Sequence, residues 1–209
     1  MPATWDSATA IGVTLSGGDL VATNTGTNST NQGAHVAAAL GQTSGKYYFE
    51  ANFTTMTGGN NYGIGVGTPT SPYNTMGGNA TQGAMVFKSG NMYSNGSPLG
   101  NITGAWTAGQ NIALAVDLDN RRFWVRQPPS GNWNGSATNN PATNVGGIVI
   151  PTGTMVPFVT FGGTSGAPGN VIRANFGASA FIGAVPSGFI AGFPTAAAAA
   201  AQYAVSVIT

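Results

Sequence analysis

The clearest pattern in the chain is an alternation of large aliphatic residues with small or polar ones in the segment Asn111–Gln127. Every second residue of Ile112–Leu118 is a large aliphatic, which is typical of a strand with one buried face. A two-residue turn at Asp119 and Asn120 would fold the second half of the segment back along the first. The pattern therefore predicts a β-hairpin with one face in a core.

The two arms of this hairpin test each other through their pairing. In the register set by the turn, one face is apolar, and on the other face Asp117 meets Arg122 across the strands. A slip of one residue would scramble both faces, so we expect this register to hold. The predicted pairs are Leu118–Arg121, Asp117–Arg122, Val116–Phe123, Ala115–Trp124 and Leu114–Val125.

Similar patterns predict strands along most of the chain. The strongest is Lys46–Thr54, in which Tyr47, Phe49, Ala51 and Phe53 share one face. Strand signals recur about every 8 to 12 residues without an amphipathic helix, which indicates an all-β, antiparallel β-sandwich. Other predicted strands are Ile11–Leu15, Asp19–Ala22, His35–Leu40, Tyr62–Gly67, Ala84–Lys88, Asn91–Ser94, Gly147–Ile150, Met155–Phe161 and Val171–Phe176.

Glycine and asparagine mark turns and close approaches. Asn95 and Gly96 form a tight-turn signal. In Tyr62–Gly67 large side chains alternate with glycines, and a face made only of glycine lets another backbone or an aromatic ring lie close against it.

The C-terminal part of the chain gives three further predictions. Met155–Phe161 and Val171–Phe176 are expected to pair around the loop between them, and Phe181–Pro186 with Phe189 to lie under the core. We divide the chain into a domain of residues 1–193 and an alanine-rich tail of residues 194–209. The tail alternates like an unpaired strand at its end, so we expect it either to dock on a neighbour or to fray.

Composition narrows the classes of function. Charged residues are only 5% of the 209, and the net charge is +1 without a basic run, so nucleic acid is not an expected partner. A surface rich in uncharged polar residues suits packing against copies of the chain or binding neutral, hydroxyl-rich ligands; it also suits a merely soluble domain. The absence of cysteine excludes disulfides and thiolate sites.

The chain carries no pattern for secretion or membrane insertion. Residues 1–20 include Asp6 and Asp19 and lack both a basic and an apolar region, so we expect no signal peptide. No stretch reaches eighteen uninterrupted apolar residues, so we expect no membrane span.

Candidate catalytic and metal-binding residues are few. Asp117 and Asp119 would lie about 7 Å apart on a strand, a separation suited to a glycosidase pair, but the hairpin register gives both a structural role. Calcium binding would need an oxygen ligand where Arg121 stands. His35 is the only histidine, and Glu50 in an aromatic strand is expected to be a paired structural carboxylate. We therefore expect no enzyme, no cofactor and no metal.

The better candidates concern recognition. An indole flanked by amides, as at Trp133, can cover the apolar face of a sugar while the amides bond its hydroxyls. The alternative is that Trp133 pins its own long loop against the sandwich. Trp106 and Trp124 adjoin strands and are expected in the core or on a sheet face. The candidate ligand-binding residues are Trp133, Asn132, Asn134, Tyr73, Asn74, Asn61 and Tyr62.

Several ordered motifs resemble a known family. Gly45–Glu50, Tyr62–Gly67, Gly109-Gln110 with Ala113–Phe123, and Val156–Phe161 resemble, in this order, successive strands of SPRY (B30.2-like) domains. The N-terminal residues Thr4-Trp5-Asp6 with Ile11–Leu15, and the late residues Ala174–Gly177, are similar to the phage and prophage branch of that family. The resemblance covers the chain from Ala3 to Phe193.

This resemblance implies a bent, concanavalin-like jelly roll of two antiparallel sheets, with ligands bound by loops at one end and no catalysis. Eukaryotic SPRY domains are peptide and protein adapters, whereas phage examples sit in virion proteins. The loops Thr68–Thr81 and Pro128–Val145 carry no peptide-binding motif that transfers from the family.

Three hypotheses follow. The first is a non-enzymatic bacteriophage virion protein of a tail fibre, tail tip or head decoration, located in the virion. Its partners would be other virion proteins, copies of itself in a homo-oligomer, and host-surface glycan. The second is a bacterial peptide-recognition or adhesin module of SPRY type. The third is a glycan hydrolase that uses Asp117 and Asp119.

Overall fold

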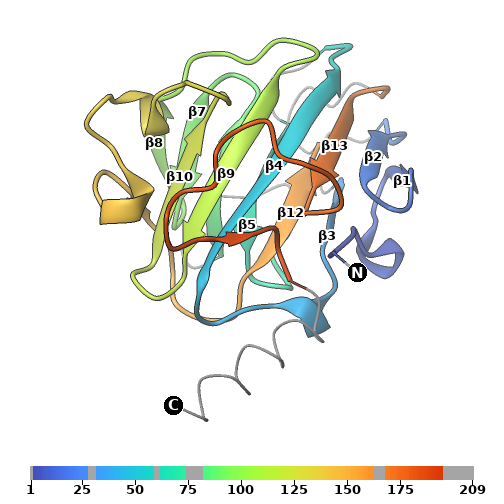
Figure 1. The fold of residues 1–209 in the computed structure, drawn as a ribbon. Helices are drawn as coiled ribbons and strands as arrows, with labels where there is room; N and C mark the ends of the chain where they lie inside the picture. Colours follow the sequence, from blue (N-terminus) through green and yellow to red (C-terminus); the bar gives the residue numbers. More distant parts are fainter. Residues whose placement is uncertain (1, 28–31, 59–61, 74–81, 162–167, 195–209) are drawn as a thin grey trace.

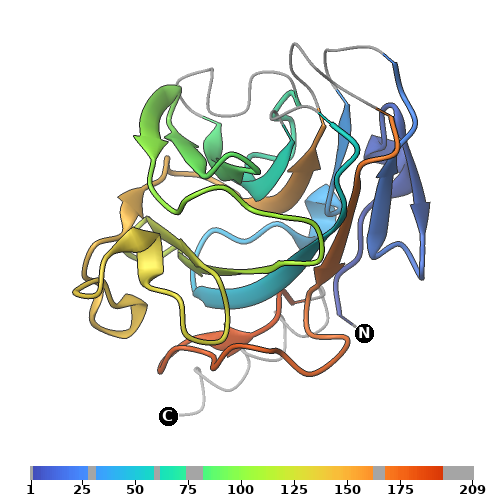
Figure 2. The same cartoon turned by 90° about the horizontal axis from the view of Figure 1, so that it is seen from above.

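The computed structural model describes residues 2–27, 32–58, 62–73, 82–161 and 168–194. Their strands form two antiparallel sheets that pack face to face, which confirms the predicted all-β sandwich (Figure 1 and Figure 2). The larger sheet contains, in spatial order, β1 (Val13–Ser16), β2 (Val21–Asn24), β13 (Val171–Asn175), β4 (Lys46–Thr55), β9 (Asn111–Asp117), β10 (Arg122–Arg126) and β11 (Ile148–Val149), with β14 (Ile190–Ala191) beside β4.

The smaller sheet faces the larger one across the core. Its strands, in spatial order, are β3 (Gly33–His35), β12 (Val156–Thr160), β5 (Gly63–Gly67), β6 (Gly83–Phe87), β7 (Asn91–Ser94) and β8 (Ser97–Asn101). Short 3-10 helices interrupt the connections at η1 (Ser7–Thr9), η2 (Ala38–Leu40), η3 (Trp133–Gly135) and η4 (Pro141–Thr143). None of the described residues form a helix long and apolar enough to cross a membrane.

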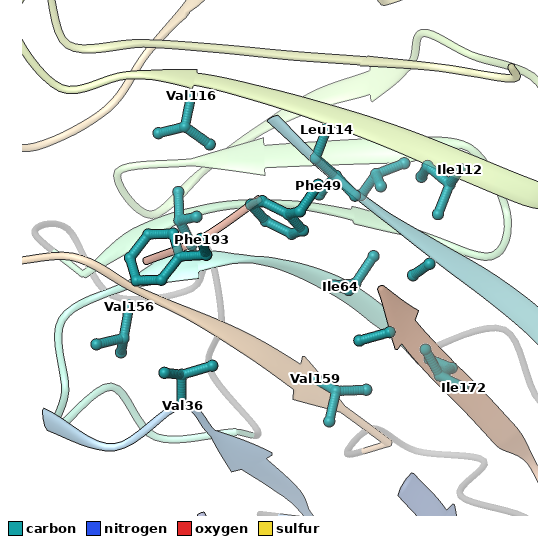
Figure 3. Packing of buried hydrophobic residues seen from close by; sticks show 14 of the residues in the cluster. Val36, Phe49, Ile64, Ile112, Leu114, Val116, Val156, Val159, Ile172 and Phe193 are labelled. Carbon is teal, nitrogen blue, oxygen red and sulfur yellow. The ribbon is translucent and has the colours of Figure 1, made fainter. Parts of the chain in front are cut away.

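The core between the sheets follows from the alternation of the strands. In β4, Tyr47, Phe49, Ala51 and Phe53 all point inward, as predicted from the sequence. Aliphatic side chains of β9, β5 and β12 meet them from the same sheet and from the opposite one (Figure 3). Trp106 also lies in this core.

The predicted hairpin register is confirmed, but its turn differs from the prediction. The strands β9 and β10 pair Asp117 with Arg122, and the pairs that follow match the prediction down to Leu114–Val125. A two-residue type I′ turn would need positive φ at both central residues. Here Asp119 and Asn120 do not have positive φ, and Arg121 takes the left-handed conformation at φ 55°.

The pairing expected between Met155–Phe161 and Val171–Phe176 is wrong. These segments contain β12 and β13, which belong to opposite sheets. β12 is paired on both edges by β3 and β5, and β13 is paired on both edges by β2 and β4. Neither strand has a free edge for the other, so the chain passes from one sheet to the other between them.

Two strand boundaries in the smaller sheet also differ from the prediction. The expected strand His35–Leu40 divides into β3, which ends at His35, and the helix η2. The strand β8 was not predicted because Pro98 and Gly100 lack strand character. It forms through the turn at Asn95 and Gly96, both of which have positive φ, as the Asn-Gly signal predicted.

The strand β8 is the exposed edge of the smaller sheet. All five of its residues are exposed, and Pro98 stands in the middle of the pairing with β7. Because proline has no N–H, the outer edge of this strand lacks one of the donors that an added strand would need.

The segment after β13 was expected to lie under the core. Instead it covers the outer face of the larger sheet. Phe181, Val185 and Phe189 pack on the outward-facing Tyr48 and Trp124. Both views show this segment, in orange-red, outside the larger sheet (Figure 1 and Figure 2). Trp124 thus lies on a sheet face, as predicted, beneath a covering layer.

The glycine face of β5 allows the close approach predicted from the sequence. A Cβ at Gly65 would lie 2.1 Å from the carbonyl oxygen of Ala84 and 2.6 Å from the Cβ of Met85. A side chain at this position would therefore push β6 away from β5.

Candidate binding groove

A groove of about 520 Å³ lies on the outer face of the larger sheet, across β13, β4 and β9. The polar part of its floor consists of outward-facing residues of these strands, and the groove is lined from the segment that follows β13 by Ala178, Ser179, Ala180 and Ile182. The inward neighbours of the floor residues are apolar core residues, so strand alternation places the polar residues on this face.

Three floor residues form a row across the strands, here called the polar row. Arg173 of β13 lies directly opposite Asn52 of β4, and Asn52 lies directly opposite Asn111 of β9. Directly opposed residues place their Cβ atoms about 5 Å apart. The row therefore runs for about 10 Å across the groove.

Hydrogen bonds fix the amides of the polar row. The Nδ2 of Asn52 donates to the carbonyl oxygen of Gly109 at 2.8 Å and to Oδ1 of Asn111 at 3.0 Å. The hydroxyl of Thr54 donates to Oδ1 of Asn52 at 2.9 Å. With its Oδ1 engaged in this way, Asn111 has its Nδ2 available for a ligand.

Arg173 differs from the other arginines in its environment. Arg121, Arg122 and Arg126 each donate to backbone carbonyl oxygens, and Lys46 forms an ion pair. Arg173 is exposed and makes no side-chain hydrogen bond or ion pair with any described residue. Its guanidinium is therefore available at one end of the polar row.

The wall of the groove is held by the buried carboxylate of Glu50, which is 3% exposed. Oε1 accepts hydrogen bonds from the hydroxyl of Tyr48 at 2.5 Å and from the amide of Gly183 at 2.7 Å. Oε2 accepts one from the amide of Ile182 at 2.9 Å. Glu50 thus has the paired structural role expected from the sequence, and it fixes residues 182–183 on the sheet.

Tyr48 keeps its proton for this bond. Burial, together with the hydrogen bond and the negative charge of Glu50, raises the pKa of Tyr48 far above its ordinary value. The phenol is therefore a permanent donor to the carboxylate across the physiological pH range.

A second clamp holds the turn that precedes this wall. The Nδ2 of Asn175 donates to the carbonyl oxygens of Ser179 and Ala180, and its Oδ1 accepts from the amides of Gly177 and Ser179. Asn175 thus uses its donors and acceptor on its own turn, which leaves the polar row as the ligand-facing part of the floor.

Trp133 has the position expected if it holds its own loop against the sandwich. Trp133 is only 7% exposed, and its ring meets Tyr48 edge-on while the guanidinium of Arg126 lies 4.4 Å from the ring centroid. Asn134 is buried and bonds the backbone of β10 at Val125 and Phe123. Trp133 therefore pins its loop to the sheet and does not present an open ring face.

The other candidate residues are divided between exposed, buried and undescribed positions. Asn132 is exposed and precedes η3 without capping it. Tyr62 is buried in the core, stacked on Phe161, and burial raises its pKa to about 12. Asn61 and Asn74 lie outside the described residues.

Tyr73 is buried and forms a hydrogen-bonded pair with His35. The hydroxyl of Tyr73 donates to the carbonyl oxygen of Thr9 at 2.6 Å, so Nδ1 of His35 must donate to that hydroxyl at 2.9 Å. Nε2 of His35 then carries no proton, and it has no hydrogen-bond partner among the described residues. Burial lowers the pKa of His35 to about 4, so the ring is neutral near pH 7.

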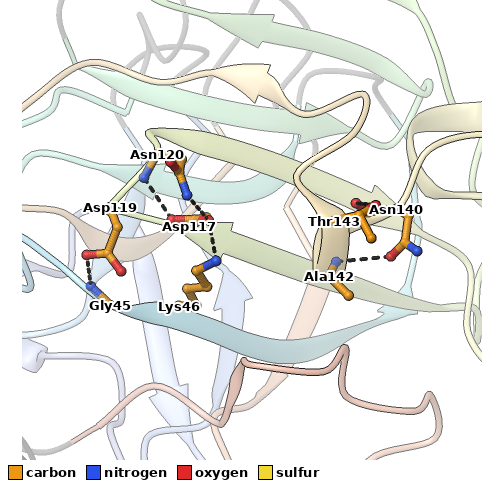
Figure 4. A network of polar contacts seen from close by, with 8 residues as sticks. All are labelled: Gly45, Lys46, Asp117, Asp119, Asn120, Asn140, Ala142 and Thr143. Carbon is orange, nitrogen blue, oxygen red and sulfur yellow. Dashed lines mark hydrogen bonds and ion pairs between the residues drawn. The ribbon is translucent and has the colours of Figure 1, made fainter.

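The hairpin carboxylates have structural partners, and Asp117 lies opposite Arg122 as predicted, but its ion pair is formed with a different residue. Asp117 forms an ion pair with Lys46 of β4, its neighbour on the other side, at 3.1 Å and accepts hydrogen bonds from Asn120 (Figure 4). Burial acts to raise the pKa of Asp117, but the Asn120 bonds and Lys46 outweigh it and lower the pKa.

Asp119 accepts a hydrogen bond from the amide of Gly45 at 2.8 Å (Figure 4). Within the described part of the chain, no three histidine, cysteine or acidic residues gather where they could hold a metal ion.

Comparisons with known proteins concern the fold. No family model matches the chain, and no curated protein matches it by sequence. Among solved structures, the SPRY domain of human HERC1 superposes with a TM-score of 0.59 at 16% identity, over 84% of this chain and 99% of that one. The chain has a SPRY-like fold. The PSpry domain of TRIM65 matches with a TM-score of 0.58 at 14% identity, over 84% of this chain and 92% of that one.

The SPRY-like fold also occurs inside a longer protein. The stonustoxin structure matches with a TM-score of 0.55 at 17% identity, over 84% of this chain but only 27% of the toxin chain. The expected resemblance to SPRY domains is thus supported at the level of the fold. The more specific resemblance to the phage branch stays a prediction.

Replacing Glu50 with glutamine should loosen the groove wall. The two carboxylate oxygens of Glu50 accept from three donors, whereas the glutamine amide has only one oxygen and its NH₂ group cannot accept. At least one buried donor would therefore lose its partner, at a cost of about 1–3 kcal/mol in the free energy of unfolding. Hydrogen exchange should show faster exchange at the amides of Ile182 and Gly183. Asp119→Asn, which alters one exposed bond, is the matched control. Unchanged exchange in Glu50→Gln would contradict this role.

Stability should fall as the pH is lowered from about 6.5 to 4. The folded protein holds His35 neutral down to about pH 4, whereas the unfolded chain takes up the proton near 6.5, so acid favours unfolding by about 3 kcal/mol over this window. Urea unfolding at fixed pH values measures this loss. His35→Phe should flatten the wild-type slope there, because the chain has no other histidine. Identical slopes in both proteins would refute the assignment.

Proposed function

We propose that the chain is a non-enzymatic binding module whose ligand occupies the groove on the larger sheet. The observation that carries this proposal is the polar row, in which an unpaired guanidinium and an available amide lie together in a walled hollow. A few convergent polar groups in a formed hollow are typical of a ligand site. The carboxylates nearest to catalytic spacing, Asp117 and Asp119, are instead bonded to structural partners.

We further propose that this module belongs to a bacteriophage virion, in a tail fibre, tail tip or head decoration. Its partners there are other virion proteins and copies of itself, and the groove contacts the host surface. This proposal is supported by the similarity of the Trp5 and Ala174–Gly177 motifs to phage SPRY domains, and by a composition with only 5% charged residues. In the fold these two motifs are adjacent, since Trp5 meets Phe176 edge-on at 4.9 Å.

A second candidate is recognition of a peptide by a bacterial adapter or adhesin. Ile182 favours it, because this side chain is 52% exposed in the groove wall and could take an apolar side chain of a peptide. The two candidates share the groove and differ in the ligand.

Blocking the groove should abolish binding. Ala180→Trp places an indole at the exposed wall of the groove, whereas Ala137→Trp places the same indole on an exposed loop that does not line it. Each protein is applied to an array of bacterial surface oligosaccharides and to a peptide library. We expect the ligands retained by the wild type and by Ala137→Trp to be lost by Ala180→Trp. Equal retention by all three proteins would reject the groove as the site.

The proposal that the chain is a virion protein is tested on purified phage particles. Mass spectrometry of purified particles of the phage that encodes the chain should detect it in a fixed ratio to the major structural proteins. Its presence only in the infected-cell lysate, and not in the particles, would leave the peptide-recognition candidate.

A further inference from the structure

We infer that the groove binds an acidic saccharide, with the carboxylate of the sugar held by Arg173 and its neighbouring hydroxyls held by Asn52 and Asn111. This inference rests on the proposed function, because it assumes that the groove is the ligand site.

The carboxylate is indicated by the state of Arg173. The chain has only six lysine and arginine residues, and the other three arginines are engaged by backbone carbonyls. Arg173 stands in the groove without a bond to any described residue. A guanidinium is a planar fork of donors that matches a carboxylate in a bidentate pair. An acid group is therefore the ligand group that this end of the row fits best.

The hydroxyls are indicated by the rest of the polar row. Nδ2 of Asn111 is a donor without a partner in the described part of the chain, and Oδ1 of Asn52 and the hydroxyl of Thr54 each have capacity to accept. Sugar hydroxyls both donate and accept, so they match this mixture. The row extends about 10 Å, so a neutral sugar ring can follow the acidic one along it.

The negative charge of Glu50 is stabilised by protein donors and lies outside the polar row. Glu50 is cross-strand to Asn175, one row further along the sheet, and both of its oxygens accept protein hydrogen bonds from residues that cover it. The wall residues Ala178, Ala180 and Ile182 are apolar and suit the C–H surface of a sugar ring.

A peptide fits the groove less well, because the strands beneath it offer no backbone. β13 is paired by β2 and β4, and β4 is paired by β13 and β9, so their main-chain donors and acceptors are already used. An extended peptide commonly gains its affinity by adding to an unpaired sheet edge. Here recognition must come from side chains, which are neutral amides, a hydroxyl and one cation.

The experiment compares matched acidic and neutral saccharides. The probes are sialyllactose and an oligogalacturonate, each as the free acid and as its methyl ester, with an acidic peptide as a third arm; dissociation constants are measured by surface plasmon resonance. For the wild type, esterification of the bound saccharide should weaken binding about tenfold or more. Arg173→Gln should bind the free acid more weakly by the same factor, and it should bind the acid and the ester with equal affinity. Arg173→Lys should recover part of the difference, and Arg122→Gln, on the far strand β10, should match the wild type.

The outcomes separate this inference from the proposed function. If Arg173→Gln binds the free acid as tightly as the wild type while Ala180→Trp does not bind, the carboxylate assignment is overturned and the groove remains the site. If Ala180→Trp binds like the wild type, the proposed function fails. If the wild type binds the acidic peptide and neither saccharide, the saccharide class is overturned. Circular dichroism of the exposed-site variants Arg173→Gln and Ala180→Trp excludes unfolding as the cause of any loss.

Discussion

The burial of one carboxylate between a sheet and its cover is the constraint on which the candidate binding face depends. Glu50 is an outward position of the central strand β4, and it is removed from water by the segment that returns over the sheet. A buried carboxylate is costly unless donors surround it, and here the donors are a phenol and two consecutive backbone amides. The cover and the carboxylate thus stabilise each other. Because the amides belong to the groove wall, the shape of the groove follows from the same contact.

Much of the sandwich could be predicted because the central strands alternate large apolar side chains with small or polar ones. The alternation in β4 and β9 defined which residues face the core, and the hairpin register followed since a slip would expose apolar side chains. The predicted pairing of β12 with β13 was wrong, because alternation reports a strand's faces but not its neighbours. The ion pair of Asp117 with Lys46 could not be predicted for the same reason: a hairpin reveals one neighbour of β9, and Lys46 belongs to the other neighbour, β4.

The groove escaped prediction for a related reason. Its polar row combines residues from three strands that are far apart in sequence, and each alone resembles an ordinary solvent-facing position. The loops drew attention instead because Trp133 and its flanking asparagines have the chemistry of sugar binding. In the structure Trp133 and Asn134 serve to fasten their loop, since a long connection over a sheet must bury some side chains and satisfy its backbone. The signal that could have pointed to the groove is Arg173, a cation within a strand of a chain that has few.

The proline in the edge strand β8 has a consequence for how copies of this protein coexist at high density. With a net charge of +1, the molecules repel one another only weakly, so electrostatics does little to keep neighbouring copies apart. An edge that lacks one of its donors is a poorer template for continued sheet growth from one molecule to the next. Pro98 thus contributes colloidal stability that a more highly charged surface would otherwise supply.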